Sequence, residues 1–286
     1  MPVRKALIPA AGFGTRFLPA TKALPKEMLA VIDKPVIQYA VEEAAASGIK
    51  HIGIITSRRK PLLEEHFRPS PELENFLQEK GKPELVEEVA RISRQANFKF
   101  ILQPEPLGLG HAVLMGEEFA GGEPFGVLNP DTLYDCPTPC LRQLVDVYED
   151  RKAPVIVLGR IDEEGTKKYG VVRARRVGER VFEILDLSEK PGPDKAFSDL
   201  AVLGRYVFTA EIFEAIRKVP RAQGGEIQLT EAIKKLVEIR PVYGVIFEGK
   251  RFDAGDKFGY LEASLHFALK RREFRARLAE LLKSLE

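Results

Sequence analysis

The sequence contains little cysteine and little histidine, and each shortage excludes a class of site. Only two of its 286 residues are cysteines, Cys136 and Cys140, and their C-x-x-x-C spacing lacks the second pair of ligands that a zinc site needs. Reduced thiols in the cytosol are the default state for such a pair. The four histidines are scattered, with neither the spacing of metal ligands nor the order of a catalytic triad.

Long apolar runs and a large excess of charge are also missing. No segment approaches the ~18 consecutive apolar residues of a membrane span, and no apolar segment of signal-peptide length follows Met-Pro-Val-Arg-Lys. The formal net charge is only +2, which does not indicate a bulk polyanion as partner. The basic cluster of Lys270–Arg272, Arg275 and Arg277 is more typical of a solvated helix face or a subunit contact. We therefore expect a cytoplasmic protein that binds neither membrane nor nucleic acid, with any anion site confined to a local patch.

What is present is an ordinary globular composition, 44% hydrophobic and 30% charged, in a chain long enough for one large α/β domain. Short apolar runs alternate with amphipathic segments in the first half, which predicts a mixed, mostly parallel central sheet flanked by helices. The second half predicts an antiparallel β elaboration that covers this sheet. Strands are expected over residues 6–9, 52–56, 98–102, 125–128, 155–158, 170–175, 181–187, 200–208 and 242–247. Helices are expected over residues 36–47, around 64, and over 84–94, 111–119, 231–238 and 260–285.

No domain boundary is visible in the sequence. We expect residues 1–286 to form a single domain, in which residues 255–286 are a C-terminal helical segment available for oligomerisation through its apolar stripe.

The stretch from Ala10 to Lys26, AAGFGTRFLPATKALPK, directly follows the first apolar run. Gly12 and Gly14 allow a sharp turn and a close approach of the backbone to a ligand, and the N–H groups of such a turn can bind an anion. Phe17 takes the place of the third glycine of a dinucleotide fingerprint, and no Gly-Lys-Ser/Thr of a Walker A loop follows. Thr15 adds a hydroxyl group to the stretch, and Arg16, Lys22 and Lys26 add cationic side chains. The alternative is a solvated surface turn, but this combination favours a polyphosphate site.

Two further polar features follow predicted strands, and ligands bind beyond the carboxyl ends of strands in such sheets. Gln103 begins QPEPLGLGHAV, and its amide can both donate to and accept from a nucleobase edge. Asp131, in VLNPDTLYD, is placed to bind a hard cation such as Mg²⁺, which takes one or two protein carboxylates. The alternatives are a loop glutamine bonded to its own backbone, and an Asp131 that only forms a turn or caps a helix.

The second half adds two more candidate groups. Glu189 and Lys190 precede a proline, and they form either an exposed turn or a site in which Glu189 accepts from sugar hydroxyls while Lys190 binds a phosphate. Asp253 follows a short predicted strand and opens the last helix. It is either a second metal ligand or the N-cap of that helix.

Several motifs together resemble those of the sugar-1-phosphate nucleotidyltransferase family, and within it the bacterial UTP–glucose-1-phosphate uridylyltransferases. The motifs run in order from Ala10 to Tyr260 and so cover nearly the whole chain. They are AAGFGTRFLPATKALPKEML, QPEPLGLGHAV, LNPD, KYGVV, EKP, LGRYVF, GEIQLTEAI and FDAGDKFGY. One departure is Asn129, where the family usually has an apolar residue before Pro-Asp, and this leaves the end of the preceding strand open.

The resemblance implies a Rossmann-like nucleotidyltransferase fold, Mg²⁺ as cofactor, UTP and glucose 1-phosphate as substrates, and a homo-oligomer, a dimer or a tetramer. The implied nucleotide-binding residues are Ala10, Ala11, Gly12, Glu27, Gln103 and Gly108, to which the glycine-rich stretch adds Gly14 and Thr15. The implied sugar-phosphate site consists of Gly170, Glu189 and Lys190. The implied metal ligands are Asp131 and Asp253. Arg16 and Lys26 are implied to face the triphosphate.

The predicted reaction is uridylyl transfer from UTP to glucose 1-phosphate, giving UDP-glucose and pyrophosphate. Its nucleophile is a phosphate oxygen that is ionised at neutral pH, so an in-line attack without a covalent intermediate needs no general base. Positioning and charge neutralisation by Arg16, Lys26 and Lys190 then carry the catalysis. The alternatives are a dTDP- or CDP-glucose pyrophosphorylase of the same family and a non-catalytic nucleotide-sugar sensor.

Overall fold

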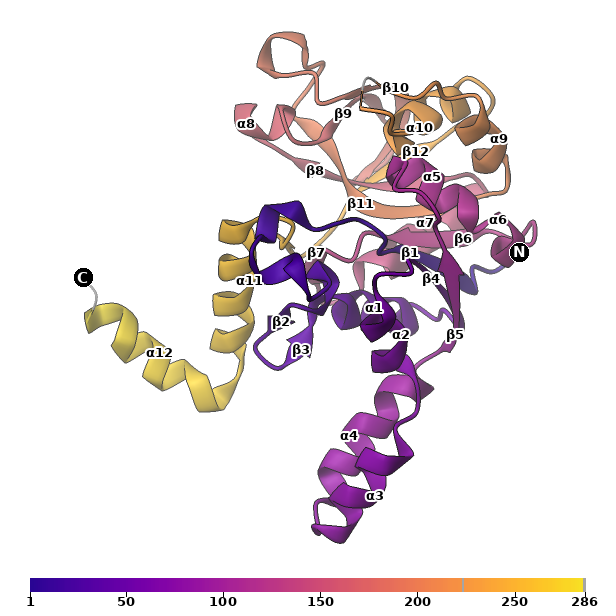
Figure 1. Ribbon diagram of the computed structural model, residues 1–286. Coiled ribbons are helices and arrows are strands. Elements are labelled where there is room, and N and C mark those ends of the chain that lie inside the picture. The colour runs from indigo at the N-terminus through magenta and orange to yellow at the C-terminus, as the bar shows by residue number, and fades with distance from the viewer. Residues whose placement is uncertain (223, 285–286) are drawn as a thin grey trace.

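The computed structural model describes residues 1–222 and 224–284 and is built on a nine-stranded sheet (Figure 1). The strands lie in the order β5-β4-β1-β6-β11-β8-β12-β10-β9. Their bounds are β1 (Lys5–Pro9), β4 (His51–Thr56), β5 (Asn97–Leu102), β6 (Phe125–Leu128), β8 (Val155–Arg160), β9 (Gly170–Arg176), β10 (Val181–Glu189), β11 (Leu200–Phe208) and β12 (Tyr243–Ile246).

The predicted mixed sheet is confirmed, and its parallel part is the set β5, β4, β1 and β6, together with the pair β8 and β12. Strand β11 is antiparallel to both β6 and β8, and β10 is antiparallel to both β12 and β9. The antiparallel part was predicted to cover the sheet, and this was wrong. It continues the same sheet, and β9 also pairs with β11 where Val171 meets Ala201.

Helices cover both faces of the sheet, as the strand sequences require. Along β1 the side chain of Leu7 enters one core cluster, while those of Ala6 and Ile8 enter the other, because successive strand residues point to opposite faces. The first cluster is closed by α5 (Gly108–Met115), α6 (Glu117–Ala120), α9 (Glu211–Arg217) and α10 (Leu229–Val237). The second is closed by α1 (Val36–Ala46), α2 (Pro61–Phe67) and α7 (Cys140–Arg151).

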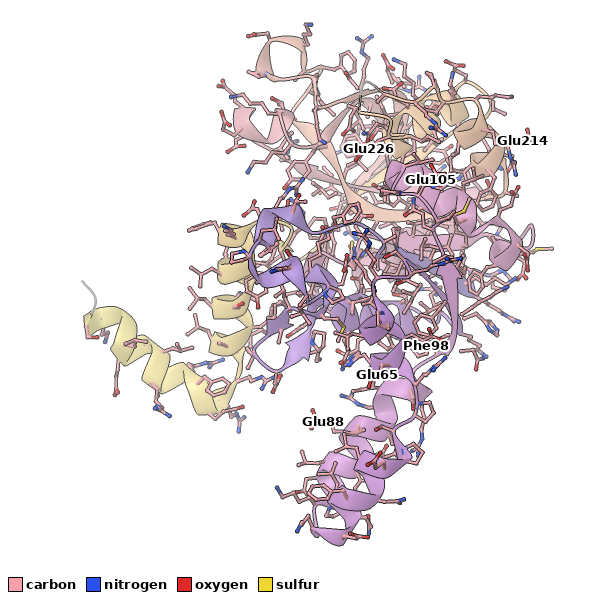
Figure 2. All side chains as sticks on the ribbon, viewed as in Figure 1. Glu65, Glu88, Phe98, Glu105, Glu214 and Glu226 are labelled. Atoms are coloured by element: carbon pink, nitrogen blue, oxygen red, sulfur yellow. The ribbon has the colours of Figure 1, made fainter. Side chains whose placement is uncertain are left out.

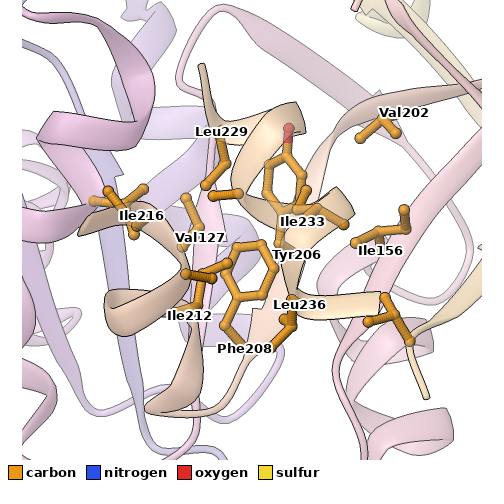
Figure 3. Close-up of a cluster of buried hydrophobic side chains, with 14 of the residues drawn as sticks. Val127, Ile156, Val202, Tyr206, Phe208, Ile212, Ile216, Leu229, Ile233 and Leu236 are labelled. Atoms are coloured by element: carbon orange, nitrogen blue, oxygen red, sulfur yellow. The ribbon is translucent and has the colours of Figure 1, made fainter. Parts of the chain in front are cut away.

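Figure 3 shows how the first cluster is packed, with Tyr206 and Phe208 of β11 among the same group of side chains as Ile233 and Leu236 of α10. Full burial of each such side chain stabilises the fold by roughly 1.5–3 kcal/mol. This packing fixes the strands and, with them, the loops at their carboxyl ends.

A small third core holds the C-terminal part of the chain against the body. It lies between α11 (Lys257–Lys270) and the two-stranded sheet of β7 (Thr132–Asp135) and β13 (Lys250–Asp253), and it includes Leu133, Phe252 and Ala263. The other elements are β2 (Ala30–Val31), β3 (Lys34–Pro35), α3 (Pro71–Glu79), α4 (Pro83–Arg94), α8 (Glu163–Thr166), α12 (Arg272–Ser284) and the 3-10 turns η1 (Thr15–Phe17), η2 (Ala20–Lys22), η3 (Lys26–Met28) and η4 (Pro193–Lys195).

Two parts extend away from the body. The α3–α4 hairpin projects from it, with Glu88 far from the sheet, and α12 leaves α11 at an angle (Figures 1 and 2). Among residues 1–222 and 224–284, no helix is both long enough and apolar enough to cross a bilayer.

Two predicted helices differ in detail, and one of the two roles considered for Asp253 is excluded. The helix predicted over 111–119 begins at Gly108 and is interrupted at Gly116, where an added methyl group would lie 2.2 Å from Leu7. The helix predicted over 260–285 is two helices, because Arg271 has extended backbone angles; residue 285 lies outside the described residues. The N-cap of α11 is Asp256, whose Oδ1 accepts from Gly259 N at 2.9 Å, so Asp253 does not cap this helix.

Candidate functional site

The Ala10–Lys26 stretch leaves the carboxyl end of β1 and passes through η1 and η2 before it ends at η3. Ala10 N donates to Ile55 O at 2.7 Å, which holds the start of the stretch beside β4. Gly14 has a φ of 68°, and a methyl group there would lie 3.0 Å from Lys26 Cβ. Both observations require glycine at this turn. The structure therefore forms the compact turn that the sequence predicts.

Two of the cavities that adjoin this stretch extend to the ends of other strands. The first, of about 470 Å³, lies between the stretch, the segment that follows β5, and the end of β6. The second, of about 270 Å³, lies between the ends of β9, β10 and β13. Figure 2 labels Glu105 and Glu226 on two segments beside the first cavity, which are joined by hydrogen bonds from Gly110 N to Ile227 O and from Ile227 N to Leu107 O.

The predicted site residues come together around these cavities. Those that line the first are Ala11, Gly12, Gly14, Thr15, Lys26, Glu27, Gln103, Gly108 and Asp131. Those that line the second are Arg16, Asp131, Gly170, Glu189, Lys190 and Asp253. Ala10 lies behind the first cavity and is buried. Asp131 lines both cavities, so a ligand in the first cavity and a ligand in the second would meet beside this residue.

Asp131 is in the turn between β6 and β7 and caps no helix. Strand β6 ends at Leu128, so Asn129 is the first residue after it, which settles where this strand ends. Lys26 Nζ lies 2.6 Å from Asp131 Oδ2. Burial would raise the pKa of the Asp131 carboxyl, but Lys26 and Arg16 together hold that pKa below its ordinary value. The carboxylate is therefore ionised at neutral pH.

Asp253 ends β13 and faces Asp131 across Gly255. A methyl group on Gly255 would lie 2.9 Å from Asp253 Oδ1 and 3.1 Å from Asp131 Oδ2, so the two carboxylates border one small space. Arg16 donates from Nη1 to Gly255 O at 3.3 Å on the same side. Among the described residues, no cluster of three or more His, Cys, Asp or Glu could hold a metal. A pair of carboxylates nevertheless fits Mg²⁺, which takes one or two from the protein and completes its shell with phosphate and water.

Two side chains also fix the orientation of the Asp253 carboxylate. Tyr169 donates its hydroxyl to Asp253 Oδ2, and Arg251 Nη2 donates to the same oxygen at 3.0 Å. Burial raises the pKa of the Tyr169 phenol, so it remains a donor across the neutral range. The Asp253 carboxylate is thereby held with Oδ1, which also accepts from Gly255 N, toward Asp131.

The second cavity has a polar end built from Glu189, Lys190 and Thr230. Thr230 donates its hydroxyl to Glu189 Oε2 at 2.7 Å, and Lys190 Nζ lies 3.3 Å from Glu189 Oε1. Lys190 has a φ of 44°, an uncommon conformation for a non-glycine residue, and its N–H is held by Tyr169 O at 3.2 Å. A methyl group on Gly170 would lie 2.9 Å from Thr230 Cγ2, so glycine is needed for this close packing.

Gln103 has a fixed orientation. Its Nε2 lies 3.3 Å from Gly108 O and 2.9 Å from His111 Nδ1. A carbonyl oxygen only accepts, so the amide nitrogen must face Gly108.

Glu27, which lines the first cavity, forms a buried ion pair with Lys60 that the sequence analysis missed. Lys60 Nζ lies 2.7 Å from Glu27 Oε2 and donates to Ala10 O at 2.7 Å. Burial raises the pKa of Glu27 and lowers that of Lys60, and the attraction between the two groups opposes both shifts. The sequence gives no signal for this pair except that a lysine follows the end of a predicted strand.

Comparison with known proteins places this geometry in a family. The model of a family described as nucleotidyl transferase matches residues 5–269. The chain belongs to the nucleotidyl transferase family. A relative from Bacillus subtilis (strain 168), UTP–glucose-1-phosphate uridylyltransferase, is 49% identical over 283 residues, covering 99% of this chain and 97% of the relative. A second protein from that strain, UTP–glucose-1-phosphate uridylyltransferase YngB, is 50% identical over 281 residues, covering 98% and 95%.

Two solved structures are also similar to this chain over nearly all of its length. A UTP-bound UGPase from Acinetobacter baumannii is 35% identical with a TM-score of 0.91, covering 99% of this chain and all of the other. A UDP-glucose pyrophosphorylase complexed with UDP-glucose is 39% identical with a TM-score of 0.86, covering 94% of this chain and all of the other.

One element that supports the site in this family member was also missed by sequence analysis. Arg205 of β11 is fully buried and donates to Asn129 O and Thr132 O, both at 2.8 Å, on the two sides of Asp131. Its charge is balanced by Glu43 of α1 at 2.8 Å. Arg205 therefore fixes the backbone of the turn that carries Asp131.

Proposed function

We propose that this chain transfers the uridylyl group of UTP to glucose 1-phosphate, giving UDP-glucose and pyrophosphate. The observation that carries the proposal is that the two cavities meet at Asp131, with the glycine-rich stretch on one side and Glu189 and Lys190 on the other. The names of the relatives and the UTP and UDP-glucose complexes of the similar structures agree with it.

In this proposal UTP occupies the first cavity. The backbone of Ala10, Ala11 and Gly12, the side chains of Glu27 and Gln103, and the backbone of Gly108 hold the uracil. Gly14 and Thr15 contact the phosphates, for which the N–H groups of such a turn are suited. Glucose 1-phosphate occupies the second cavity, where Gly170 and Glu189 contact the sugar and Lys190 binds its phosphate.

Nucleotidyltransferases of this family generally use a divalent metal, and we propose Mg²⁺ held by Asp131 and Asp253. The space beside Gly255 that both carboxylates border supports this ligand pair. When bound, the ion would supply positive charge against the reacting phosphates.

The protein's own residues act mainly by position and charge. Lys190 orients the phosphate of glucose 1-phosphate so that one of its oxygens attacks the α-phosphorus of UTP in line with the departing pyrophosphate. The new bond joins that oxygen to the α-phosphorus, and the bond between the α-phosphorus and the α–β bridging oxygen breaks. Arg16 and Lys26 offset the charge that develops on the pyrophosphate. No proton has to be removed, because the attacking phosphate is already ionised.

The direct test is pyrophosphate release from UTP, measured with and without glucose 1-phosphate and Mg²⁺. We expect release only when all three are present. A panel in which UTP is replaced by dTTP or CTP tests the choice of base. Release from UTP without glucose 1-phosphate, or only from another nucleotide, would contradict the proposal.

Lys190→Ala is expected to raise KM for glucose 1-phosphate by ~10- to 100-fold while leaving KM for UTP nearly unchanged, because a charge-assisted contact to one substrate is lost. Steady-state kinetics with each substrate varied in turn measures both constants. Lys195→Ala is the matched control, since Lys195 is exposed on η4 a few residues away. A rise confined to KM for UTP would mean that the two cavities are assigned in reverse.

We also propose that the chain is a single domain. We further propose that it forms a cytoplasmic homo-oligomer, a dimer or a tetramer, in which residues 255–286 form the contact between subunits. The single domain is supported because the nine-stranded sheet uses strands from β1 to β12, so no cut between these two strands leaves an intact sheet. The contact is supported by exposed Leu261 of α11 and Leu281 of α12. Sedimentation of the full chain and of a variant with both leucines changed to lysine tests the assembly.

A further inference from the structure

Lys60 forms hydrogen bonds near both ends of the glycine-rich stretch. It precedes α2, far from the stretch in sequence, and its Nζ bonds to the carbonyl of Ala10, where the stretch begins, and to the carboxylate of Glu27, just beyond its end. The Lys60 side chain is 8% exposed and that of Glu27 is 1% exposed. A lysine that pairs with two acceptors in such a place fixes both of them.

The second carboxylate oxygen of Glu27 has no partner. Its Oε1 is buried and, in the structure as described, accepts no hydrogen bond. A buried acceptor without a donor is unfavourable, so a donor from a ligand would complete it. Glu27 lines the first cavity together with Gln103, and these two have the least exposed polar side chains in its lining. The heterocycle of a nucleotide, which is its uncharged part, fits this buried end better than the phosphates do.

We propose that Lys60 is a positioning residue that determines the choice of pyrimidine base. It keeps Glu27 as an ionised, acceptor-only group whose Oε1 takes the N3–H of uracil, and it thereby disfavours cytosine, whose N3 is itself an acceptor. This inference rests on the proposed function, since it specifies how the UTP site distinguishes UTP from CTP.

The charge state of Glu27 is what Lys60 controls. Burial raises the pKa of Glu27, and the fields that oppose this most strongly come from Lys60 and, on η3, from Lys26. Lys26 is already paired with Asp131 at 2.6 Å. Without Lys60 the pKa of Glu27 rises further, and the carboxyl becomes protonated. A protonated carboxyl can donate to the N3 of cytosine, so the discrimination against CTP is lost.

The test compares kcat/KM for UTP and for CTP in pyrophosphate release, for the wild type and for Lys60→Met, between about pH 6 and pH 9. We expect the UTP-to-CTP ratio of Lys60→Met to be ~10- to 100-fold below that of the wild type at neutral pH. The ratio should recover as the pH rises, because Glu27 ionises again, whereas the wild-type ratio stays flat. Arg58→Met is the matched control, because Arg58 is exposed two residues away and should keep the wild-type ratio.

A second pair of variants keeps the inference testable if Lys60→Met folds poorly. Glu27→Gln should lower the ratio by a similar factor without recovery at high pH. The double variant Lys60→Met/Glu27→Gln should have the ratio of Glu27→Gln alone, because Lys60 acts only through Glu27.

Two outcomes would overturn the inference. One is a loss of kcat/KM in Lys60→Met that is equal for UTP and CTP at every pH, which would leave Lys60 a purely structural role. The other is an altered ratio of UTP to dUTP with an unchanged ratio of UTP to CTP, which would place a ribose hydroxyl on Glu27. Failure of the wild type to release pyrophosphate would contradict the proposed function instead, and equilibrium binding of UTP and CTP to the same variants would then decide the role of Lys60.

Discussion

Asp131→Asn is expected to lower kcat by ~10²–10³-fold, a loss comparable with that of a single charge-stabilising group in other enzymes. Asp131 lines both cavities and borders the space beside Gly255, so its charge acts where the two substrates would meet. Asparagine keeps the shape and removes the charge that Mg²⁺ prefers in a ligand. The concentration of Mg²⁺ needed for half-maximal rate should rise at the same time. Pyrophosphate release over a Mg²⁺ titration measures both quantities.

The fold should survive this change, because the Lys26–Asp131 pair is partly exposed, at 22% and 25%. Circular dichroism and the melting temperature check this. Asp150→Asn is the matched control, since the side chain of Asp150 on α7 is 72% exposed and distant in sequence from the site residues. A variant at position 131 with near-normal kcat and an unchanged Mg²⁺ requirement would contradict the metal assignment.

Arg205→Met should reduce the free energy of unfolding by about 3–5 kcal/mol, because it leaves the Glu43 carboxylate in the interior without its partner. Burial disfavours the charged form of Arg205, yet Glu43 holds the pKa of the guanidinium above its ordinary value, so Arg205 is charged in the folded protein. Two carbonyls that Arg205 now satisfies, those of Asn129 and Thr132, also lose a donor. Urea denaturation followed by circular dichroism measures the change.

A double variant separates the effect of the unpaired buried charge from the effect of losing the hydrogen bonds that hold the turn. Arg205→Met/Glu43→Gln removes both charges, and it should recover part of the stability while kcat remains reduced, because the turn that carries Asp131 is still less firmly held. Arg217→Met is the control, since Arg217 pairs with Glu117 at the surface, where such pairs contribute ~0–1 kcal/mol. Equal destabilisation by Arg217→Met and Arg205→Met would contradict the role given to burial.

The sequence predicted the parts of the site that depend on local chemistry. A glycine-rich turn after a buried strand, an amide after a second strand and a carboxylate after a third are visible as motifs, because each is encoded within a few neighbouring residues. The periodicity of apolar residues likewise predicted nearly all the elements of the sheet. The predicted position of the β9–β10 pair was wrong, because the pairing of a strand depends on partner strands that its own local sequence does not specify.

Only the tertiary structure revealed how the site groups are held. Lys60 and Glu27 are 33 positions apart, Tyr169 and Asp253 are 84 apart, and Glu43 and Arg205 are 162 apart. None of these pairs has a fixed spacing that a motif could record. Each forms because folding brings two residues that are distant in sequence to the same point, and a charge in the interior is stable only beside a partner. The sequence by itself therefore determined which chemical groups the candidate site contains, whereas packing between distant elements determined their charge states and positions.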